Sequence, residues 1–378
     1  MTVAVIRPRL DPLIDGPLVG PRLLALVGDE SGCAMWRAWQ PVKYLRTHGY
    51  PCDWEFVRNP ALLAVPFTYQ AVVFCRQAWS REDRHDARRM LRRWRDAGLR
   101  VFYEADDDLF TPFVVHQQLG RVNAEKTRAQ LEADRQAALW MLSQVDGVTV
   151  STQYLASTVR RFTDAPVEVV PNAIDAGWFL EQQQGVQRPH PGPTIGWAGG
   201  NRPDTDLEQM AIAWGRIAER FPDVTFVVVG HQPPVIAAHV PEDRIRRTEW
   251  LPTSEYPKAL VGIDIGCCPL EDTPFNRSKT PIKAWEYALS GAAVVASRTV
   301  YEKVLDDGLT GYLAETAEEW EETLDTLLEF GAQRSRMAGR LRADVLTRWA
   351  LGKNYWRWPL AWHRLFAERG RSPKGGTR

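Results

Sequence analysis

The strongest constraint on the fold is a regular alternation between short apolar segments and longer amphipathic ones. A continuous apolar run of this kind fits a strand of a parallel sheet that is covered on both faces. In the first half of the chain such runs occur at 22–28, 69–76, 100–110, 146–152 and 167–175. Helical segments separate them, most clearly at 81–98 and 126–145. This order predicts an α/β domain with a doubly wound parallel sheet.

The alternation stops once and then starts again. The stretch 181–193, EQQQGVQRPHPGP, is polar and contains three prolines, which is typical of a linker. Beyond it, strands are predicted at 194–200, 224–230, 263–270 and 292–297, and helices at 207–222, 281–291 and 316–330. We therefore predict two domains, residues 1–180 and 194–349. We expect the last helix, within 350–378, to cross back toward the N-terminal domain.

Charge and cysteine content narrow the class of protein. The 378 residues contain 47 lysines and arginines and 47 aspartates and glutamates, so net charge gives no general attraction to nucleic acid or membranes. Five cysteines, an odd number without metal-site spacing, indicate free thiols in a reducing cytoplasm. No apolar run approaches the ~20 residues of a membrane span.

The segment 275–297, FNRSKTPIKAWEYALSGAAVVAS, places charged side chains beside a buried-type helix and strand. Thr280 can cap the helix and Pro281 suits its first position, so Lys279 would lie at a helix N-terminus that favours an anion. Glu286 follows seven residues later, close to two turns, and faces the same side. A phosphate at Lys279 and ribose hydroxyls at Glu286 would match a nucleoside diphosphate. The alternative is a solvated helix face.

The same region resembles a known family. DIGCCPLEDTPFNRSKTPIKAWEYALSGAAVVASRTVYEKVLDDGLTGYLAE is similar to the C-terminal half of GT-B fold glycosyltransferases, in the large retaining family called glycosyl transferases group 1, which has phage-encoded members. VDGVTVSTQYLASTV and VEVVPNAID resemble the end of that family's N-terminal half. The resemblance implies two Rossmann-like domains facing a central cleft. It also implies that Lys279 holds the diphosphate of a nucleotide-sugar and Glu286 its ribose.

One position departs from the family pattern. Many relatives carry two glutamates eight positions apart, the first of which touches the donor sugar. Ser278 stands at that first place. The donor sugar is therefore unassigned, and Asn276 and Lys279 are expected to serve in its place, with Thr280 beside them in the donor site.

Two further segments of the second half are candidates for donor binding. In IGWAGGNRPDTDLE (195–208), Gly199 and Gly200 allow the backbone to approach a ligand closely, and Arg202 could clamp the diphosphate. Fixed cations there would stabilise the charge that develops on the leaving diphosphate. Arg202 could equally be a surface arginine. By resemblance, Trp250 and Leu251 lie in the loop that holds the base, and the alternative for Trp250 is a place in the core.

In the first half, DESGCAMWR (29–37) follows the first predicted strand. The resemblance implies a loop that closes over donor and acceptor, and Gly32 is the best position for close approach. Arg37 could contact an acceptor or a phosphate, although a salt bridge on the helix face is the alternative.

Three consecutive aspartates end the predicted strand 100–110, on the edge that would face the cleft. Asp106, Asp107 and Asp108 are candidates for acceptor or sugar binding. A divalent metal held by an Asp-x-Asp pair is a second interpretation. The GT-B resemblance argues against metal dependence, because cationic side chains take that role. Helix capping by Asp108 is the structural alternative.

The arginine-rich segment 88–100, RRMLRRWRDAGLR, is of the kind that can bind nucleic acid. Nearby acidic residues favour the alternative that it is a solvated helix. The leading prediction is a metal-independent, retaining glycosyltransferase without a cofactor. It would transfer a sugar from a UDP- or GDP-type nucleotide-sugar to a hydroxyl acceptor, either a glycan or a modified nucleic-acid base. The alternatives are a sugar-nucleotide epimerase of the same fold and a non-catalytic nucleotide-sugar-binding module.

Overall fold

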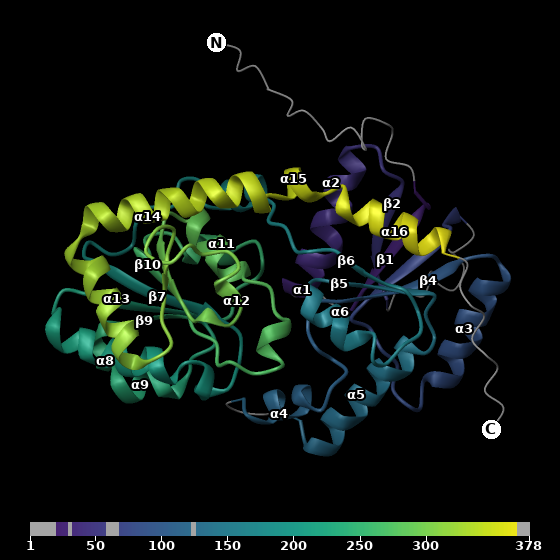
Figure 1. Ribbon diagram of the computed structural model, residues 1–378, viewed down its shortest axis with the longest axis horizontal. Coiled ribbons are helices and arrows are strands. Elements are labelled where there is room, and N and C mark those ends of the chain that lie inside the picture. Colours follow the sequence, from purple (N-terminus) through teal and green to yellow (C-terminus); the bar gives the residue numbers. More distant parts are fainter. Residues whose placement is uncertain (1–19, 29–31, 58–67, 122–125, 369–378) are drawn as a thin grey trace, which may run out of the picture.

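The computed structural model describes residues 20–28, 32–57, 68–121 and 126–368. Within them the chain forms two α/β domains that lie side by side, each built around a six-stranded sheet (Figure 1). Every strand pairing in both sheets is parallel. The architecture predicted from the alternating pattern is confirmed.

The N-terminal sheet has the order β2-β1-β3-β4-β5-β6. Helices α3, α5 and α6 cover one face, while α2 and α16 cover the other. Because both faces are covered, β1, β3 and β5 are buried along their whole length, which explains their unbroken apolar sequences. The strands are β1 Leu23–Val27, β2 Cys52–Phe56, β3 Ala71–Cys75, β4 Arg100–Ala105, β5 Gly147–Val150 and β6 Val167–Val169. The helices are α1 Gly32–Ala34, a π-helical turn Met35–Trp39, α2 Gln40–Thr47, α3 Arg84–Asp96, α4 Phe113–Leu119, α5 Arg128–Leu142, α6 Gln153–Val159 and α7 Ala176–Gln182.

The C-terminal sheet has the order β12-β11-β10-β7-β8-β9. One of its faces packs against α8, α9 and α13, and the other against α7, α11 and α14. The strands are β7 Thr194–Gly199, β8 Thr225–Gly230, β9 Ile245–Thr248, β10 Ile265–Cys268, β11 Ala293–Ala296 and β12 Tyr312–Leu313. The helices are α8 Glu208–Arg220, α9 Pro234–His239, α10 Tyr256–Ala259, α11 Ile282–Leu289, α12 Arg298–Tyr301, α13 Ala317–Glu329 and α14 Gly331–Asp344.

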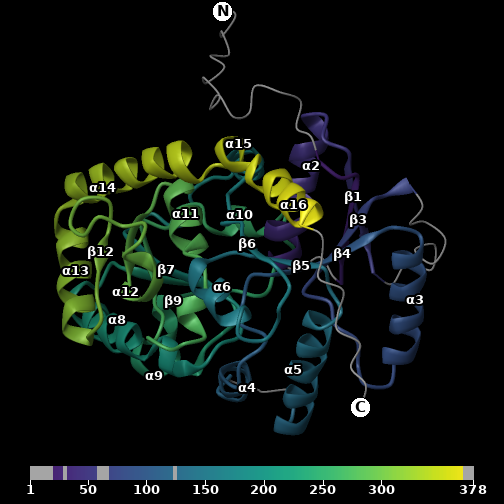
Figure 2. The ribbon, with the colours of Figure 1, turned by 45° about the vertical axis from the view of Figure 1, so that its right-hand side comes forward.

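The end of the chain returns to the first domain. After α14, a π-helical turn (Val345–Trp349) leads into α15 (Leu351–Asn354) and α16 (Arg357–Ala367), which run along the same side of the molecule (Figure 2). There α16 packs on the N-terminal sheet, with Trp362 against Tyr50 and Leu365 over Gly147. A β-bridge between Ile174 and Ala350 joins the two segments that cross between the domains.

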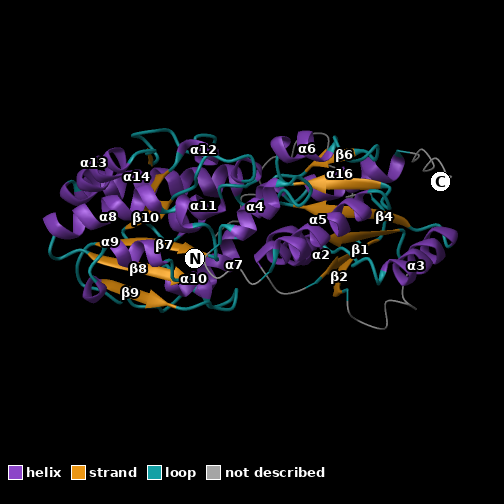
Figure 3. Cartoon of the chain, turned by 90° about the horizontal axis from the view of Figure 1, so that it is seen from below, coloured by secondary structure: helices purple, strands orange, loops and turns teal. Residues whose placement is uncertain are grey.

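The two sheets present their carboxyl ends to each other. Seen from below, the strand arrows of both sheets point toward the boundary between the domains (Figure 3). The loops that follow β3 and β4 therefore meet loops of the second domain, which is where ligands bind in open parallel sheets. No helix in the described part of the chain is long and apolar enough to cross a membrane.

Some elements differ from the sequence prediction. The strands β2, β9 and β12 were not predicted, because each lies at or next to the edge of its sheet and its partly exposed sequence mixes polar with apolar residues. One helix was expected across 351–370, but the structure divides it into α15 and α16, with a turn at Tyr355 and Trp356.

Candidate active-site cleft

Charged side chains from both domains meet at the boundary between the sheets. Lys279, just before α11, places Nζ 3.1 Å from Oδ1 of Asp107, in the loop after β4. Arg76 holds the other oxygen of that carboxylate, with Nη1 3.3 Å from Oδ2. Burial alone would raise the pKa of Asp107, but the charges of Lys279 and Arg76 outweigh burial and lower this pKa to about 2. Lys279 therefore already binds an oxyanion, one that the opposite domain supplies.

Arg76 is a residue that sequence reasoning missed. It directly follows β3, and its φ of 59° is the only positive value among the described non-glycine residues. Its Nη1 lies 3.2 Å from Oδ1 of Asp106 and also contacts Sγ of Cys33. A strained backbone at a sheet's ligand-binding edge is typical of functional positions. The available signal was its place at the end of a buried strand, the same place that singled out Asp106.

The contacts of Arg76 also bear on whether the aspartates after β4 bind a divalent metal ion. Potential ligand atoms of Cys33, Asp106 and Asp107 lie within 4.8 Å of one another. However, the Arg76 guanidinium touches all three, so a cationic side chain already neutralises this cluster. Burial, followed by the charge of Asp106, also raises the pKa of the Cys33 thiol, which disfavours the thiolate that a metal would need. Next to it, Gly32 faces open space: an added Cβ would meet nothing within 4 Å.

The third aspartate has a different role from its neighbours. Asp108 is buried, and its Oδ1 accepts hydrogen bonds from the backbone N–H groups of Phe110 and Thr111, each at 3.0 Å. Its Oδ2 accepts a bond from the Thr111 hydroxyl. The carboxylate of Asp108 is therefore bound within the turn before α4, whereas Asp106 and Asp107 reach the charged side chains at the domain boundary. Arg37 is likewise structural, since it is buried and paired with Glu104 at 2.8 Å.

The loop after β7 lies at the same boundary, where it contacts the first domain. A Cβ on Gly199 would lie 2.6 Å from the Trp197 ring, so packing within the sheet already requires glycine there. At Gly200 the nearest atoms belong to Trp250, 3.6 Å away. Trp250 is 70% exposed, which rules out the alternative that it belongs to the core. Leu251, next to it, is partly buried. An open aromatic ring thus stands over the Gly200 backbone.

Several polar atoms near this loop are buried without a hydrogen-bond partner. They include Nε of Arg202, Nε of Arg121 and Nε2 of His231. Arg202 keeps one loose ion pair, with Nη1 3.6 Å from Oδ2 of Asp206. Buried polar atoms are rarely left unpaired in native proteins. This group of donors is therefore a candidate for binding a ligand with several acceptor oxygens.

The residues before α11 are held tightly within the protein. The Asn276 amide nitrogen donates to Oδ1 of Asp206 at 2.7 Å and to the Glu271 carbonyl at 3.0 Å, and its side chain is fully buried. The hydroxyl of Ser278 donates to the Phe275 carbonyl. Through these contacts, Asn276 and Ser278 hold the shape of the loop that contains Lys279.

The predicted cap of α11 is wrong in detail. The N-cap residue is Pro281, and no side chain accepts a cap hydrogen bond there. Instead, Thr280 has a buried hydroxyl without a partner. Lys279 has extended backbone angles and lies before the helix, with its ammonium 4.6 Å from the centre of the Phe275 ring. It reaches the cleft from the loop preceding α11.

Glu286 is buried in the second domain and held by two neighbours. Its Oε2 accepts hydrogen bonds from the Tyr256 hydroxyl at 2.8 Å and from Nζ of Lys283 at 2.9 Å. The Lys283 ammonium also lies 4.4 Å from the centre of the Tyr256 ring. The other oxygen, Oε1, has no hydrogen bond to any described residue. Glu286 is thus a fixed, charged acceptor with one oxygen left over.

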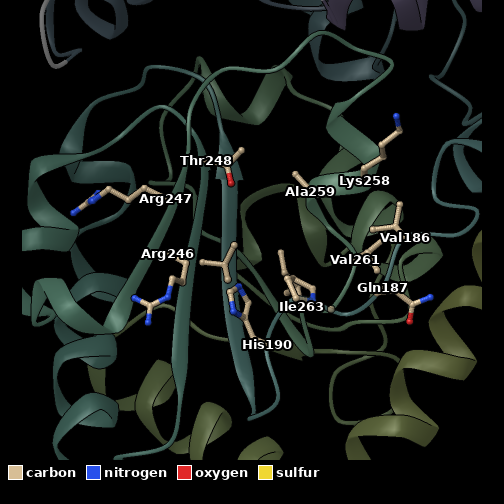
Figure 4. A pocket seen from close by; sticks show the side chains of 13 residues that line it. Val186, Gln187, His190, Arg246, Arg247, Thr248, Lys258, Ala259, Val261 and Ile263 are labelled. Carbon is tan, nitrogen blue, oxygen red and sulfur yellow. The ribbon is translucent and has the colours of Figure 1, made fainter.

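A separate pocket of about 410 Å³ lies in the C-terminal domain (Figure 4). It is formed by the linker near His190, the strands β8 and β9, and α10. None of the site residues predicted from the sequence lines it. Two of the cationic side chains that line this pocket already form ion pairs: Arg247 pairs with Glu242, and Lys258 pairs with Glu255.

Comparisons with known proteins agree with this geometry. Residues 192–329 match the family model described as Glycosyl transferases group 1. A Bacillus subtilis protein provisionally assigned as the teichuronic acid biosynthesis glycosyltransferase TuaH is 27% identical over 176 residues. That match covers 43% of this chain and 43% of the relative, so it spans less than half of the relative's length.

Two solved structures share the overall fold. Anabaena HepE in complex with UDP-glucose is 13% identical with a TM-score of 0.58, and the match covers 91% of this chain and 98% of that one. Sucrose-phosphate synthase from Thermosynechococcus elongatus is also 13% identical, with a TM-score of 0.61 and coverage of 92% and 99%.

Two parallel-sheet domains with facing carboxyl ends define the fold class, which is the GT-B fold shared with these solved structures. The match of residues 192–329 to the group 1 glycosyltransferase model agrees with the resemblance found in the sequence of this domain.

Proposed function

We propose that the protein transfers a sugar from a nucleoside diphosphate donor to a hydroxyl acceptor, with retention of configuration and without a metal ion. The observation that carries the proposal is the set of cations at the carboxyl ends of both sheets, where Lys279 already binds a carboxylate oxygen. Residues 192–329 match a glycosyltransferase family model, and HepE, which shares the fold, was solved with UDP-glucose.

Each part of the donor has a matching group in the cleft. Lys279 and Arg202 would bind the diphosphate, Oε1 of Glu286 would accept from a ribose hydroxyl, and the exposed ring of Trp250 offers a surface for the base. The bond between the anomeric carbon and the diphosphate oxygen breaks, and the acceptor oxygen bonds to that carbon. The acceptor proton passes to an oxygen of the leaving diphosphate. Fixed cations stabilise the charge that develops on that group.

Cationic side chains would replace a metal ion in this reaction. Arg76 neutralises the aspartates that could otherwise bind a divalent cation, and Lys279 and Arg202 lie on the donor side. We propose a glycan as the acceptor, because TuaH is named for the synthesis of a sugar polymer. A modified nucleic-acid base is the second candidate acceptor. All five cysteines are free thiols, which supports a cytoplasmic location.

A thermal-shift screen against UDP- and GDP-sugars tests the proposal. Binding of a donor to the folded protein should raise its melting temperature, by an amount that grows with donor concentration. Release of the nucleoside diphosphate should require the sugar donor and should continue in EDTA. If no nucleotide-sugar or nucleoside diphosphate shifts the melting temperature, the proposed function is wrong. Loss of turnover in EDTA would contradict metal independence alone.

A further inference from the structure

Arg121 comes from the N-terminal domain but is held against the C-terminal one. It follows α4, which lies at the boundary between the domains in Figures 1 and 3. Its backbone forms an antiparallel bridge with Pro203, the neighbour of Arg202. Gln117 of α4 adds a contact, with Nε2 3.4 Å from Oδ2 of Asp206. The contacts between α4 and the loop after β7 thus fix where this arginine lies.

Within the part of the chain that the structure describes, no hydrogen bond or ion pair holds the side chain of Arg121. Its Nε is buried and has no hydrogen bond, and the guanidinium makes no ion pair with any described residue. Nε of Arg202 and Nε2 of His231 are buried and unpaired in the same way. His231 is fixed by its backbone N–H, which donates to the Gly199 carbonyl at 2.9 Å. Nitrogen atoms from both domains therefore lie buried near one another without hydrogen bonds to described residues, while Asp206 holds Arg202 only loosely.

The charges around Arg121 point to an anion. Burial lowers the pKa of Arg121, and although Asp107 opposes this effect, Arg202 and Arg76 add to it. Burial also lowers the pKa of His231, and although Asp204 opposes this shift, Arg121 and Arg202 add to it. The protein thus gathers like charges whose mutual repulsion an anionic ligand would relieve.

We propose that Arg121 is a catalytic residue that the N-terminal domain contributes to the donor diphosphate, completing the cation set that Arg202 and Lys279 begin in the C-terminal domain. This inference rests on the proposed function. A planar guanidinium suits two phosphate oxygens at once. The diphosphate would then be fully bound only when α4 is docked on the loop after β7, so that donor binding and contact between the domains favour each other.

The test compares ligands that differ in their phosphates. The affinities of UDP, GDP and the matching nucleosides are measured by calorimetry for the full chain and for Arg121→Ala. The nucleoside diphosphate that the wild type binds more tightly should bind Arg121→Ala about tenfold to hundredfold more weakly, the loss expected for a charge-assisted hydrogen bond. The matching nucleoside should bind both proteins equally, which a merely structural role would not explain. Arg128→Ala, an exposed arginine at the start of α5, is the matched control and should bind like the wild type.

Each outcome has a separate meaning. If the wild type binds neither nucleoside diphosphate, the proposed function fails and this inference fails with it. If the wild type binds and Arg121→Ala binds equally well, with unchanged turnover, only the role of Arg121 is overturned. If Arg121→Ala does not fold, Arg121→Lys is measured in its place. This variant keeps the positive charge but loses the planar set of guanidinium donors. An intermediate loss of diphosphate affinity would support the role of Arg121, and wild-type affinity would overturn it.

Discussion

The two ends of the proposed donor site are held in different ways. Lys279, at the phosphate end, pairs with Asp107 of the opposite domain. Among the described residues, the carboxylate of Glu286, at the ribose end, bonds to Tyr256 and Lys283, both of its own domain. The phosphate end therefore depends on how the two domains meet, whereas the ribose end is formed within one domain. Changes at the first should affect catalysis and domain contact, and changes at the second should affect nucleotide recognition.

The largest effect is expected for Lys279→Ala. Removing a cation from the developing charge of the leaving group should lower kcat by about a hundredfold to a thousandfold. The melting temperature should change little, because Arg76 still pairs with Asp107 when Lys279 is removed. Steady-state kinetics and thermal unfolding provide the measurements. Lys303→Ala, an exposed lysine after α12, should leave kcat unchanged, and wild-type kcat in Lys279→Ala would contradict the assigned role.

A second prediction concerns acid stability at the phosphate end. The pKa of Asp107 is about 2 in the folded protein, below its ordinary value of 3.8, so the unfolded chain binds more protons between these values. The stabilisation is fully present above about pH 4 and is lost as the pH falls through about 2; it amounts to at most about 2 kcal/mol. Urea unfolding at several pH values should show a shallower acid loss in Asp107→Asn. Identical slopes for the two proteins would exclude this ion pair as a source of stability.

At the ribose end, Glu286→Gln should weaken donor binding by about tenfold, because a charged acceptor becomes a neutral one. The sharper readout is discrimination between a nucleoside diphosphate and its 2′,3′-dideoxy analogue. Wild-type protein should prefer the ribose form, and Glu286→Gln should lose most of that preference. An unchanged preference would place the ribose elsewhere. Lys258→Ala, which breaks an exposed pair with Glu255 on α10, serves as the control.

The smallest effect is expected from removing the charge of Asp107, the carboxylate that competes with the donor phosphates for Lys279. In Asp107→Asn, Lys279 no longer has to exchange a carboxylate for a phosphate, so nucleoside diphosphate affinity should rise by severalfold, about the strength of a partly exposed ion pair. Calorimetry at low ionic strength measures this. Asp134→Asn, which breaks the exposed pair with Lys126, should not change affinity. Weaker binding in Asp107→Asn would mean that Asp107 assists the donor instead of competing with it.

The sequence predicted those parts of the site that lie in one continuous segment. Lys279 and Glu286 belong to one recognisable stretch, and Asp106 and Asp107 directly follow a buried strand. Arg121 carries no local signal, and Arg76 carries only its place at the end of a buried strand, because their roles come from contacts with distant loops. Asp108 shows the opposite problem, because its sequence context is the same as that of Asp106 and Asp107 and predicted the same role. Its carboxylate instead accepts hydrogen bonds within a local turn. Alternation of apolar and helical segments was enough to predict the fold, although it missed the edge strands β2, β9 and β12.

A crystal structure with a bound nucleoside diphosphate tests the central claim most directly. The account predicts phosphate oxygens within hydrogen-bond distance of Lys279 Nζ, in place of Asp107, with the ribose at Glu286. A nucleotide bound instead in the pocket beside His190 and Thr248, with Lys279 still paired to Asp107, would contradict it.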